Sequence, residues 1–211
     1  MKLKYMLAAG AILFSCTASA QTTAGIRAYN GNSLSNGEYY QSYAFRRESP
    51  AEVVISERGA AERGDASAQF KLALRYDVGE GVPQDYAEAV KWLRSAADQD
   101  FVKAQYNLGC MYDSGRGVSQ NHTEAAKWFR KAAEHGYASA QKNLGAKYGR
   151  GQGVPQSHTE AYIWSSIAAE TGDAGAVANR DFAGSQLSSE DLEAALKRAV
   201  ELYEEIQHRQ G

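Results

Sequence analysis

A repeat of 36 residues constrains the fold of this chain more than any other feature of its sequence. Shifting the sequence by 36 residues aligns three copies, which span residues 65–100, 101–136 and 137–172. The positions that recur are mostly small, apolar or aromatic residues and glycines. A unit of this length cannot bury an apolar face alone, so its copies must stack to form a continuous core. The sequence therefore predicts a repeat architecture.

Within each copy, the spacing of the recurring residues predicts a helix, a glycine turn and a second helix. In the first copy Ala68, Leu72 and Tyr76 are four apart, which places them on one face of a helix. Gly79 and Gly81 follow, and glycine readily adopts the left-handed backbone at which helices end. Alanines and a tryptophan then recur at helical spacing in the second half of the copy. We therefore expect an all-α solenoid.

The recurring residues resemble those of the SEL-one-like repeat (SLR) family, a relative of the tetratricopeptide repeats. The second copy shows the pattern as AQYNLGCMYDSGRGVSQNHTEAAKWFRKAAEHG, residues 104–136. Ser119 and Ser157 depart from it, where other copies or the family carry Pro or Asp, and we expect them to weaken a turn or a cap only. The resemblance implies a right-handed α-solenoid of stacked helix-turn-helix repeats of 36 residues. It also implies a non-enzymatic protein that binds other proteins.

Both ends of the repeat array are expected to carry caps, which shield the open ends of a solenoid from water. Residues 49–64 align with the second helix of a copy, so we expect a lone N-terminal capping helix there. Residues 173–211 are expected to form C-terminal capping helices. The first of these has Arg180 where the copies have leucine, and the last has an apolar stripe from Leu192 to Ile206.

Residues 21–48 belong neither to the copies nor to the caps. They are rich in Gly, Ser and Tyr, and turn dipeptides such as Asn30–Gly31 predict an irregular arm. Two interpretations stay open: a disordered tether, or an arm that packs on the solenoid or on a partner. The second interpretation depends on its aromatic side chains, which are Tyr29, Tyr39, Tyr40, Tyr43 and Phe45.

Residues 1–20 have the three parts of a secretory signal peptide: two lysines, an apolar run, and small residues that end in Ala-Ser-Ala. We expect cleavage after Ala20 and export to a bacterial periplasm. The alternative is a lipoprotein, because Leu-Phe-Ser-Cys resembles a lipobox, and lipidation at Cys16 would attach the chain to a membrane. Cleavage after Ala20 would leave Cys110 as the only cysteine, and we expect it to be a small buried hydrophobe.

Charge and motifs argue against nucleic-acid binders and enzymes. The net charge is −2 at pH 7, so the chain lacks the basic field that a phosphate backbone attracts. Ser139 and Lys142 have the S-x-x-K spacing of β-lactamases, but the S-D-N and K-T-G motifs are missing. Two His-Thr-Glu triplets, at His122 and His158, recur 36 residues apart and are expected to be solvated repeat positions. We therefore expect no catalysis, cofactor, metal or small-molecule substrate.

The positions that vary between copies are the candidates for partner binding. By analogy with related solenoids, the variable positions of the first helices face a concave groove. These helices carry six basic residues against two acidic ones, which predicts a partner with an acidic surface; the alternative is that the charges are only solvated. One predicted row runs through Arg75, Met111 and Lys147, which are 36 residues apart. The predicted partner-binding residues are Phe70, Lys71, Arg75, Tyr106, Asn107, Met111, Lys142, Asn143, Lys147 and Arg150.

Two functions follow from the resemblance, and the sequence leaves both open. The first is a periplasmic adaptor or scaffold that assembles envelope or signalling complexes through the concave surface of its first helices. The alternative is an immunity protein that neutralises, in the periplasm, a phospholipase toxin delivered by type VI secretion. The expected partner is a protein in both cases.

Overall fold

The computed structural model describes residues 50–210 of the chain. The chain divides into two units, residues 1–46 and residues 47–211, and all the described residues lie in the second unit. The predicted signal peptide (1–20) and the predicted arm (21–48) lie outside the described residues, so both stay predictions.

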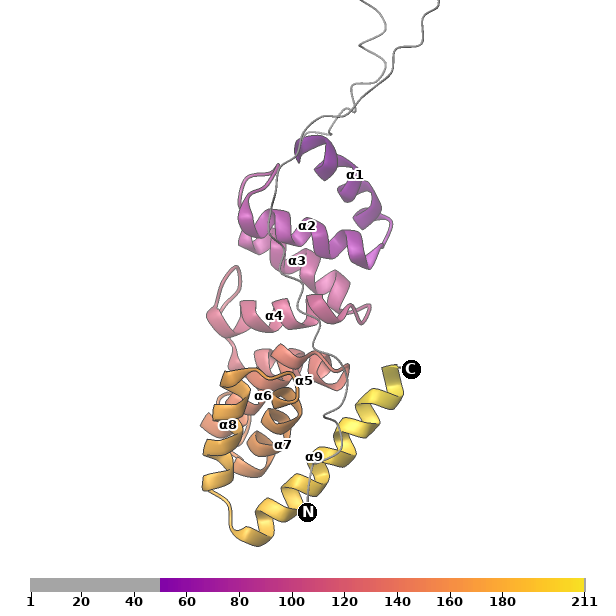
Figure 1. Cartoon of the computed structure of the whole chain (residues 1–211). Helices are drawn as coiled ribbons and strands as arrows, with labels where there is room; N and C mark the ends of the chain where they lie inside the picture. The colour runs from indigo at the N-terminus through magenta and orange to yellow at the C-terminus, as the bar shows by residue number, and fades with distance from the viewer. Residues whose placement is uncertain (1–49, 211) are drawn as a thin grey trace, which may run out of the picture. The chain divides into compact units, whose positions relative to one another are not determined.

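Nine α-helices and no strand make up the described part of the chain, which confirms the all-α prediction. The helices are α1 Pro50–Glu62, α2 Ala66–Val78, α3 Tyr86–Ala97, α4 Val102–Ser114, α5 His122–Glu134, α6 Ala138–Arg150, α7 His158–Ala169, α8 Ala174–Ser185 and α9 Ser189–Gln210. Three hairpins, α2–α3, α4–α5 and α6–α7, correspond to the three copies (Figure 1). Each hairpin packs on the next, α3 against α4 and α5 against α6. A lone helix, α1, precedes them, and α8 and α9 follow.

Glycines and capping side chains mark the helix ends within each copy. α2, α4 and α6 each end at a glycine with a left-handed φ, of 80°, 73° and 65°. Asp85 and Asn121 each accept two backbone hydrogen bonds at the starts of α3 and α5. Ser157 accepts only one at the start of α7, from the backbone N–H of Glu160 at 3.2 Å. The serine therefore weakens this cap by one hydrogen bond and leaves the helix intact.

The glutamine that recurs in every copy joins each hairpin to the helix before it. The side-chain amides of Gln69, Gln105 and Gln141 each donate to the backbone carbonyl eight residues earlier, at 3.0, 3.3 and 3.1 Å. All three glutamines are buried. The last carbonyls of a helix need a donor when they are buried, so this recurring polar residue has a structural role.

An arginine–tyrosine contact also links successive copies, and it was not predicted from the sequence. Arg58 donates to the hydroxyl of Tyr76 at 2.5 Å, and the same contact recurs from α3 to α4 and from α5 to α6. The guanidinium carbon lies 6.0, 5.6 and 5.5 Å from the tyrosine ring centroid, within the range of cation–π contacts. The signal was present in the sequence, because Arg58, Arg94 and Arg130 recur at the period of the repeat.

The second glycine of each turn is where one copy touches the copy before it. Gly117 and Gly153 have left-handed φ values of 71° and 77°. A Cβ atom on Gly117 would lie 2.2 Å from the carbonyl oxygen of Tyr86. On Gly153 it would lie 2.1 Å from the carbonyl oxygen of His122. Both carbonyls belong to the first residue of a second helix, so glycine is what allows the copies to approach this closely.

The two helices of a hairpin fit each other by side-chain size. Phe129 of α5 is 1% exposed, and it occupies the space left by Gly109 of α4. A Cβ atom on Gly109 would lie 2.7 Å from the Phe129 ring. The equivalent positions of the first copy hold Ala73 and Leu93, so a smaller side chain on α3 accompanies a larger residue on α2.

Gly109→Ala is expected to lower the free energy of unfolding by about 1–3 kcal/mol, the usual cost of overpacking a core. Adding Phe129→Leu recreates the Ala–Leu pair of the first copy and should recover part of that loss. A double-mutant cycle measured by urea unfolding gives the coupling between the two positions. Losses that simply add would contradict this account of the packing.

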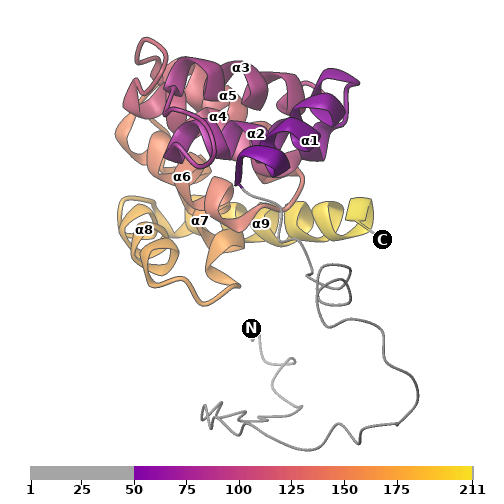
Figure 2. The same cartoon turned by 90° about the horizontal axis from the view of Figure 1, so that it is seen from above.

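The helices that cap the two ends of the array make different contacts. In α1, Glu57 stands where the second helices of the copies have Leu93 and Phe129, and it forms an ion pair with Arg75 at 2.5 Å. A polar contact therefore replaces an apolar one at this position of the first end. At the other end α9 packs on α7 (Figure 2). Here Ile163, which is 4% exposed, replaces the lysine of the first two copies, as expected for a helix covered by another.

Candidate protein-binding surface

The first helices of the copies, α2, α4 and α6, carry all ten predicted partner-binding residues. On each of these helices the exposed positions are three, four, seven or eleven residues apart, so they share one side. We call this side the A face. Its exposed residues are Ser67, Lys71, Leu74, Val78, Lys103, Ser114, Ser139 and Arg150.

Met111 and Lys147 do not lie on the A face, which corrects the predicted row of Arg75, Met111 and Lys147. Met111 is 3% exposed and Lys147 is 5% exposed, and Arg75 is half-buried. Side chains at this repeat position reach back to the preceding copy or cap: Arg75 pairs with α1 and Lys147 with α4. Stacking of the copies therefore removes this position from the surface.

Lys147 belongs to a charged cluster where the second and third copies meet. Its Nζ forms an ion pair with Asp113, and Nδ1 of His122 lies 2.7 Å from the same carboxylate oxygen. Burial alone would raise the pKa of Asp113, but hydrogen bonds from Lys147 and His122 outweigh it and hold that pKa below its ordinary value. His122 is half-buried in this cluster, so the prediction that it is a solvated position was wrong.

Ion pairs within the protein compensate three of the six basic residues that were expected to make the groove basic. Arg75 lies 2.5 Å from a carboxylate oxygen of α1. Lys142 lies 2.9 Å from Asp173 at the start of α8. Lys147 is held in the cluster with Asp113. The surface is therefore less basic than a count of residues implied.

Three basic residues of the A face keep their charge uncompensated. Lys71, Lys103 and Arg150 are exposed, and none of them forms an ion pair with another residue in the range 50–210. The acidic residues of the same helices, Asp77 and Asp113, are both ion-paired. The A face therefore presents three positive charges to solvent.

Phe70 and Tyr106 are half-buried and pack against other aromatic rings. The ring centroid of Phe70 lies 5.1 Å from that of Phe101, and the centroid of Tyr106 lies 5.0 Å from that of Tyr137. Burial, together with the neighbouring Cys110, raises the pKa of Tyr106 to about 12. The tyrosine hydroxyl is therefore protonated at neutral pH.

The remaining predicted residues of this region are tied to their neighbours. Asn107 donates to the backbone carbonyl of Lys103 at 2.7 Å, and Asn143 hydrogen-bonds to Tyr106. Burial raises the pKa of the Cys110 thiol, so the thiol is protonated at neutral pH. Cys110 packs against the core but is only partly buried, so it is less buried than was predicted from the sequence.

Exposed apolar residues also lie on this side, and the list of predicted partner-binding residues left them out. Leu74 is 38% exposed and Val78 is 64% exposed. Phe182 of α8, at the position equivalent to Leu74, is 60% exposed. Large apolar side chains at variable repeat positions were the available signal.

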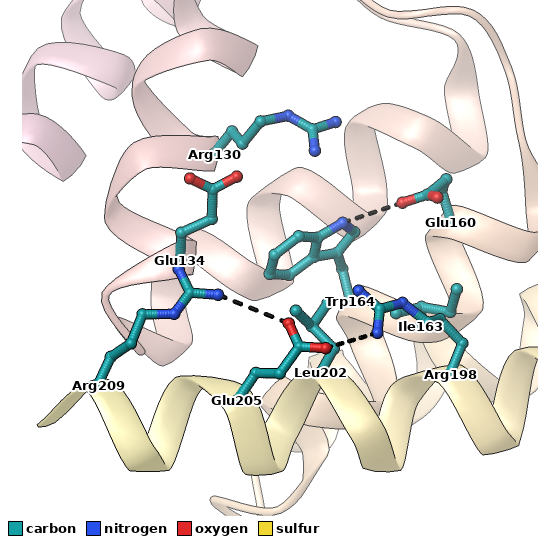
Figure 3. A pocket seen from close by; sticks show the side chains of 9 residues that line it. All are labelled: Arg130, Glu134, Glu160, Ile163, Trp164, Arg198, Leu202, Glu205 and Arg209. Atoms are coloured by element: carbon teal, nitrogen blue, oxygen red, sulfur yellow. Dashed lines mark hydrogen bonds and ion pairs between the residues drawn. The ribbon is translucent and has the colours of Figure 1, made fainter. Parts of the chain in front are cut away.

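A crevice of about 350 Å³ lies between α5, α7 and α9 (Figure 3). Charged side chains surround Trp164, whose Nε1 donates to Glu160 at 3.2 Å, and Arg198 lies 2.8 Å from Glu205. Its lining charges balance, so the crevice has no net charge that would select a ligand. Its lining residues are Arg130, Glu134, Glu160, Ile163, Trp164, Arg198, Leu202, Glu205 and Arg209.

The lysine of the S-x-x-K spacing forms an ion pair within the protein. Lys142 of the S-x-x-K spacing pairs with Asp173, and Ser139 is exposed. From Pro50 to Gln210, no group of three His, Cys, Asp or Glu side chains could hold a metal ion. Over the same residues, no helix combines the length and the apolar character needed to cross a bilayer.

Comparisons with known proteins agree with the three hairpins. The family model for the Sel1 repeat matches residues 66–101, 102–137 and 138–173. The chain is similar to a Sel1 repeat protein from Oxalobacter formigenes, with 38% identity and a TM-score of 0.57, over 61% of this chain and 97% of that one. It is also similar to c5321, a protective antigen present in uropathogenic Escherichia coli strains that displays an SLR fold. That match has 28% identity and a TM-score of 0.55, over 81% of this chain and 45% of c5321. No curated protein matches the chain.

Proposed function

The chain belongs to the Sel1 repeat family, and from that premise we propose that it binds a partner protein through its A face. Sel1 repeat proteins are generally modules of protein–protein interaction. The proposal rests mainly on the positive charge of the A face. Lys71, Lys103 and Arg150 are exposed and uncompensated, whereas the acidic residues of the same helices are ion-paired within the chain.

The partner that fits this side has an acidic surface with apolar groups in it. Exposed charges of one sign steer a partner of the opposite sign and act mainly on the association rate. Leu74 and Val78 supply exposed apolar area beside these charges, and apolar anchors contribute much of the energy of an interface. Three hairpins offer a surface on the order of the ~800 Å² per partner of a standard interface.

We place this function in the periplasm, as an adaptor or scaffold. The support is the signal-like sequence of residues 1–20, and the mass of the exported chain tests it. A chain that begins at Gln21 is expected, whereas a diacylglycerol-modified chain that begins at Cys16 would place the protein on a membrane. An immunity protein that neutralises a type VI phospholipase toxin is the alternative function.

Reversing two charges of the A face tests the binding surface. The partner is first captured from periplasmic extract with the wild-type chain and identified by mass spectrometry. Lys71→Glu combined with Lys103→Glu should then slow association with that purified partner by about tenfold at low salt, as the loss of electrostatic steering predicts. Stopped-flow or surface-plasmon measurements at several salt concentrations give this rate.

The matched control reverses two exposed lysines on the second helices of the same two copies, Lys91→Glu with Lys127→Glu. The net charge changes equally, so the control should associate at nearly the wild-type rate if the A face is the site. Equal effects of the two double variants would reject the A face as the binding surface. A captured phospholipase that the wild-type chain inhibits would select the immunity function over the adaptor.

A further inference from the structure

The C-terminal helix α9 has more apolar surface than its packing on the solenoid uses. Ala195, Ala199 and Ile206 are at most 4% exposed and form its inner side. Three larger side chains, Leu196, Val200 and Tyr203, are 42%, 41% and 38% exposed. They are four and three residues apart, so they form one stripe beside the inner side. We call this the α9 stripe.

Two opposite charges accompany the stripe along its outer edge. Lys197 and Glu204 are seven residues apart, which is close to two helical turns, so they lie on the same flank. Both are exposed, and neither forms an ion pair with any residue from 50 to 210. The nearby pair of Arg198 and Glu205 lines the crevice with α7 instead.

We propose that the α9 stripe is a homodimer interface, in which α9 of a second copy of this chain packs antiparallel across it. A two-fold axis at Val200 brings the same flank of both helices together and reverses their direction. Leu196 then lies close to Tyr203 of the second copy, and Lys197 lies close to Glu204 of the second copy. In each pair the two residues are displaced from each other by one residue, or about 1.5 Å, along the helix.

The order of residues along α9 is what favours a second copy over an unrelated partner. An isologous contact requires that each residue on one side of the axis finds its complement on the other side of the same sequence. The α9 stripe meets this requirement for apolar contact, and Lys197 and Glu204 beside it meet the requirement for charge, each pair centred within one residue of Val200. The stripe offers three partly exposed side chains per copy, far fewer residues than a standard interface of about 800 Å² per partner contains, so we expect a weak dimer that forms at high concentration.

Charge reversal within α9 tests the pairing directly. By analytical ultracentrifugation, the wild-type chain should shift from monomer to dimer as its concentration rises. Lys197→Glu makes both flank positions acidic and Glu204→Lys makes both basic, so each variant alone should dimerise at least about tenfold more weakly, because like charges then face each other. An equimolar mixture of the two variants should dimerise again, and so should a chain that carries both substitutions.

Lys127→Glu on α5 is the control for Lys197→Glu, because it changes the net charge equally and should leave the association unchanged. Circular dichroism checks that all variants keep their helicity, and rescue in the mixture shows independently that each single variant is folded. A wild-type chain that stays monomeric at several hundred micromolar overturns the proposal. Cross-linking of the stripe to residues 21–48 of the same chain, or single variants that dimerise as well as wild type, also overturns it.

Discussion

Gly153→Ala is expected to lower the free energy of unfolding by roughly 2–5 kcal/mol. A left-handed backbone costs a non-glycine residue about 1–2 kcal/mol, and Gly153 has a φ of 77°. Its new Cβ would also lie 2.1 Å from the carbonyl oxygen of His122, and overpacking adds about 1–3 kcal/mol. The backbone there has little freedom, because the side chain of Asn121 caps α5 at that end.

Gly172→Ala separates the two causes of this loss. Gly172 has nearly the same φ, 78°, but no heavy atom lies within 4 Å of where its Cβ would be. Its substitution should therefore cost only the backbone strain, about 1–2 kcal/mol. Urea unfolding followed by circular dichroism measures both variants. Equal losses at the two glycines would show that the contact between copies contributes nothing.

Trp128→Ala should lower the free energy of unfolding by roughly 3–5 kcal/mol, as large aromatic truncations in cores do. Trp128 of α5 is 7% exposed, and the ammonium of Lys131 lies 4.4 Å from its ring centroid. The truncation removes both the buried apolar area and this cation–π contact.

Two further variants make the tryptophan measurement specific. Trp92 occupies the same repeat position in the first copy but is only half-buried, so Trp92→Ala should cost less than Trp128→Ala. Trp128→Phe should cost least, because the indole N–H of Trp128 is buried and has no hydrogen-bond acceptor among the described residues. Thermal and urea unfolding give the order of the three losses. A larger loss at Trp92 would contradict burial as the cause.

Local chemistry explains why the repeat could be predicted so fully. The helix ends depend on residues within the copy: a left-handed glycine such as Gly79 after the first helix, and a capping side chain such as Asp85 before the second. These interactions span only a few residues, so spacing reveals them. The buried positions, such as Leu72 and its equivalents, were equally visible, because each copy buries the same face against its neighbours.

The binding surface was less predictable, because its exposure depends on contacts that the period does not encode. Arg75 and Lys147 occupy equivalent positions, yet Lys147 is buried against Asp113 and Arg75 is half-buried against Glu57. Both contacts join elements in different copies or caps. A count of charges on the first helices could not tell which of them had partners, so it overstated how basic the surface is.

The sequence by itself determined the period of the array, the helix–turn–helix form of each copy and the need to stack, because these follow from backbone preference and apolar spacing. Only the tertiary structure decided which side chains remain for a partner. Stacking buried Met111, paired Lys142 with Asp173, and left Lys71 and Leu74 exposed. The physical reason is that burial and ion pairing depend on which side chains meet when two copies pack together. The period of the sequence specifies only that the copies pack.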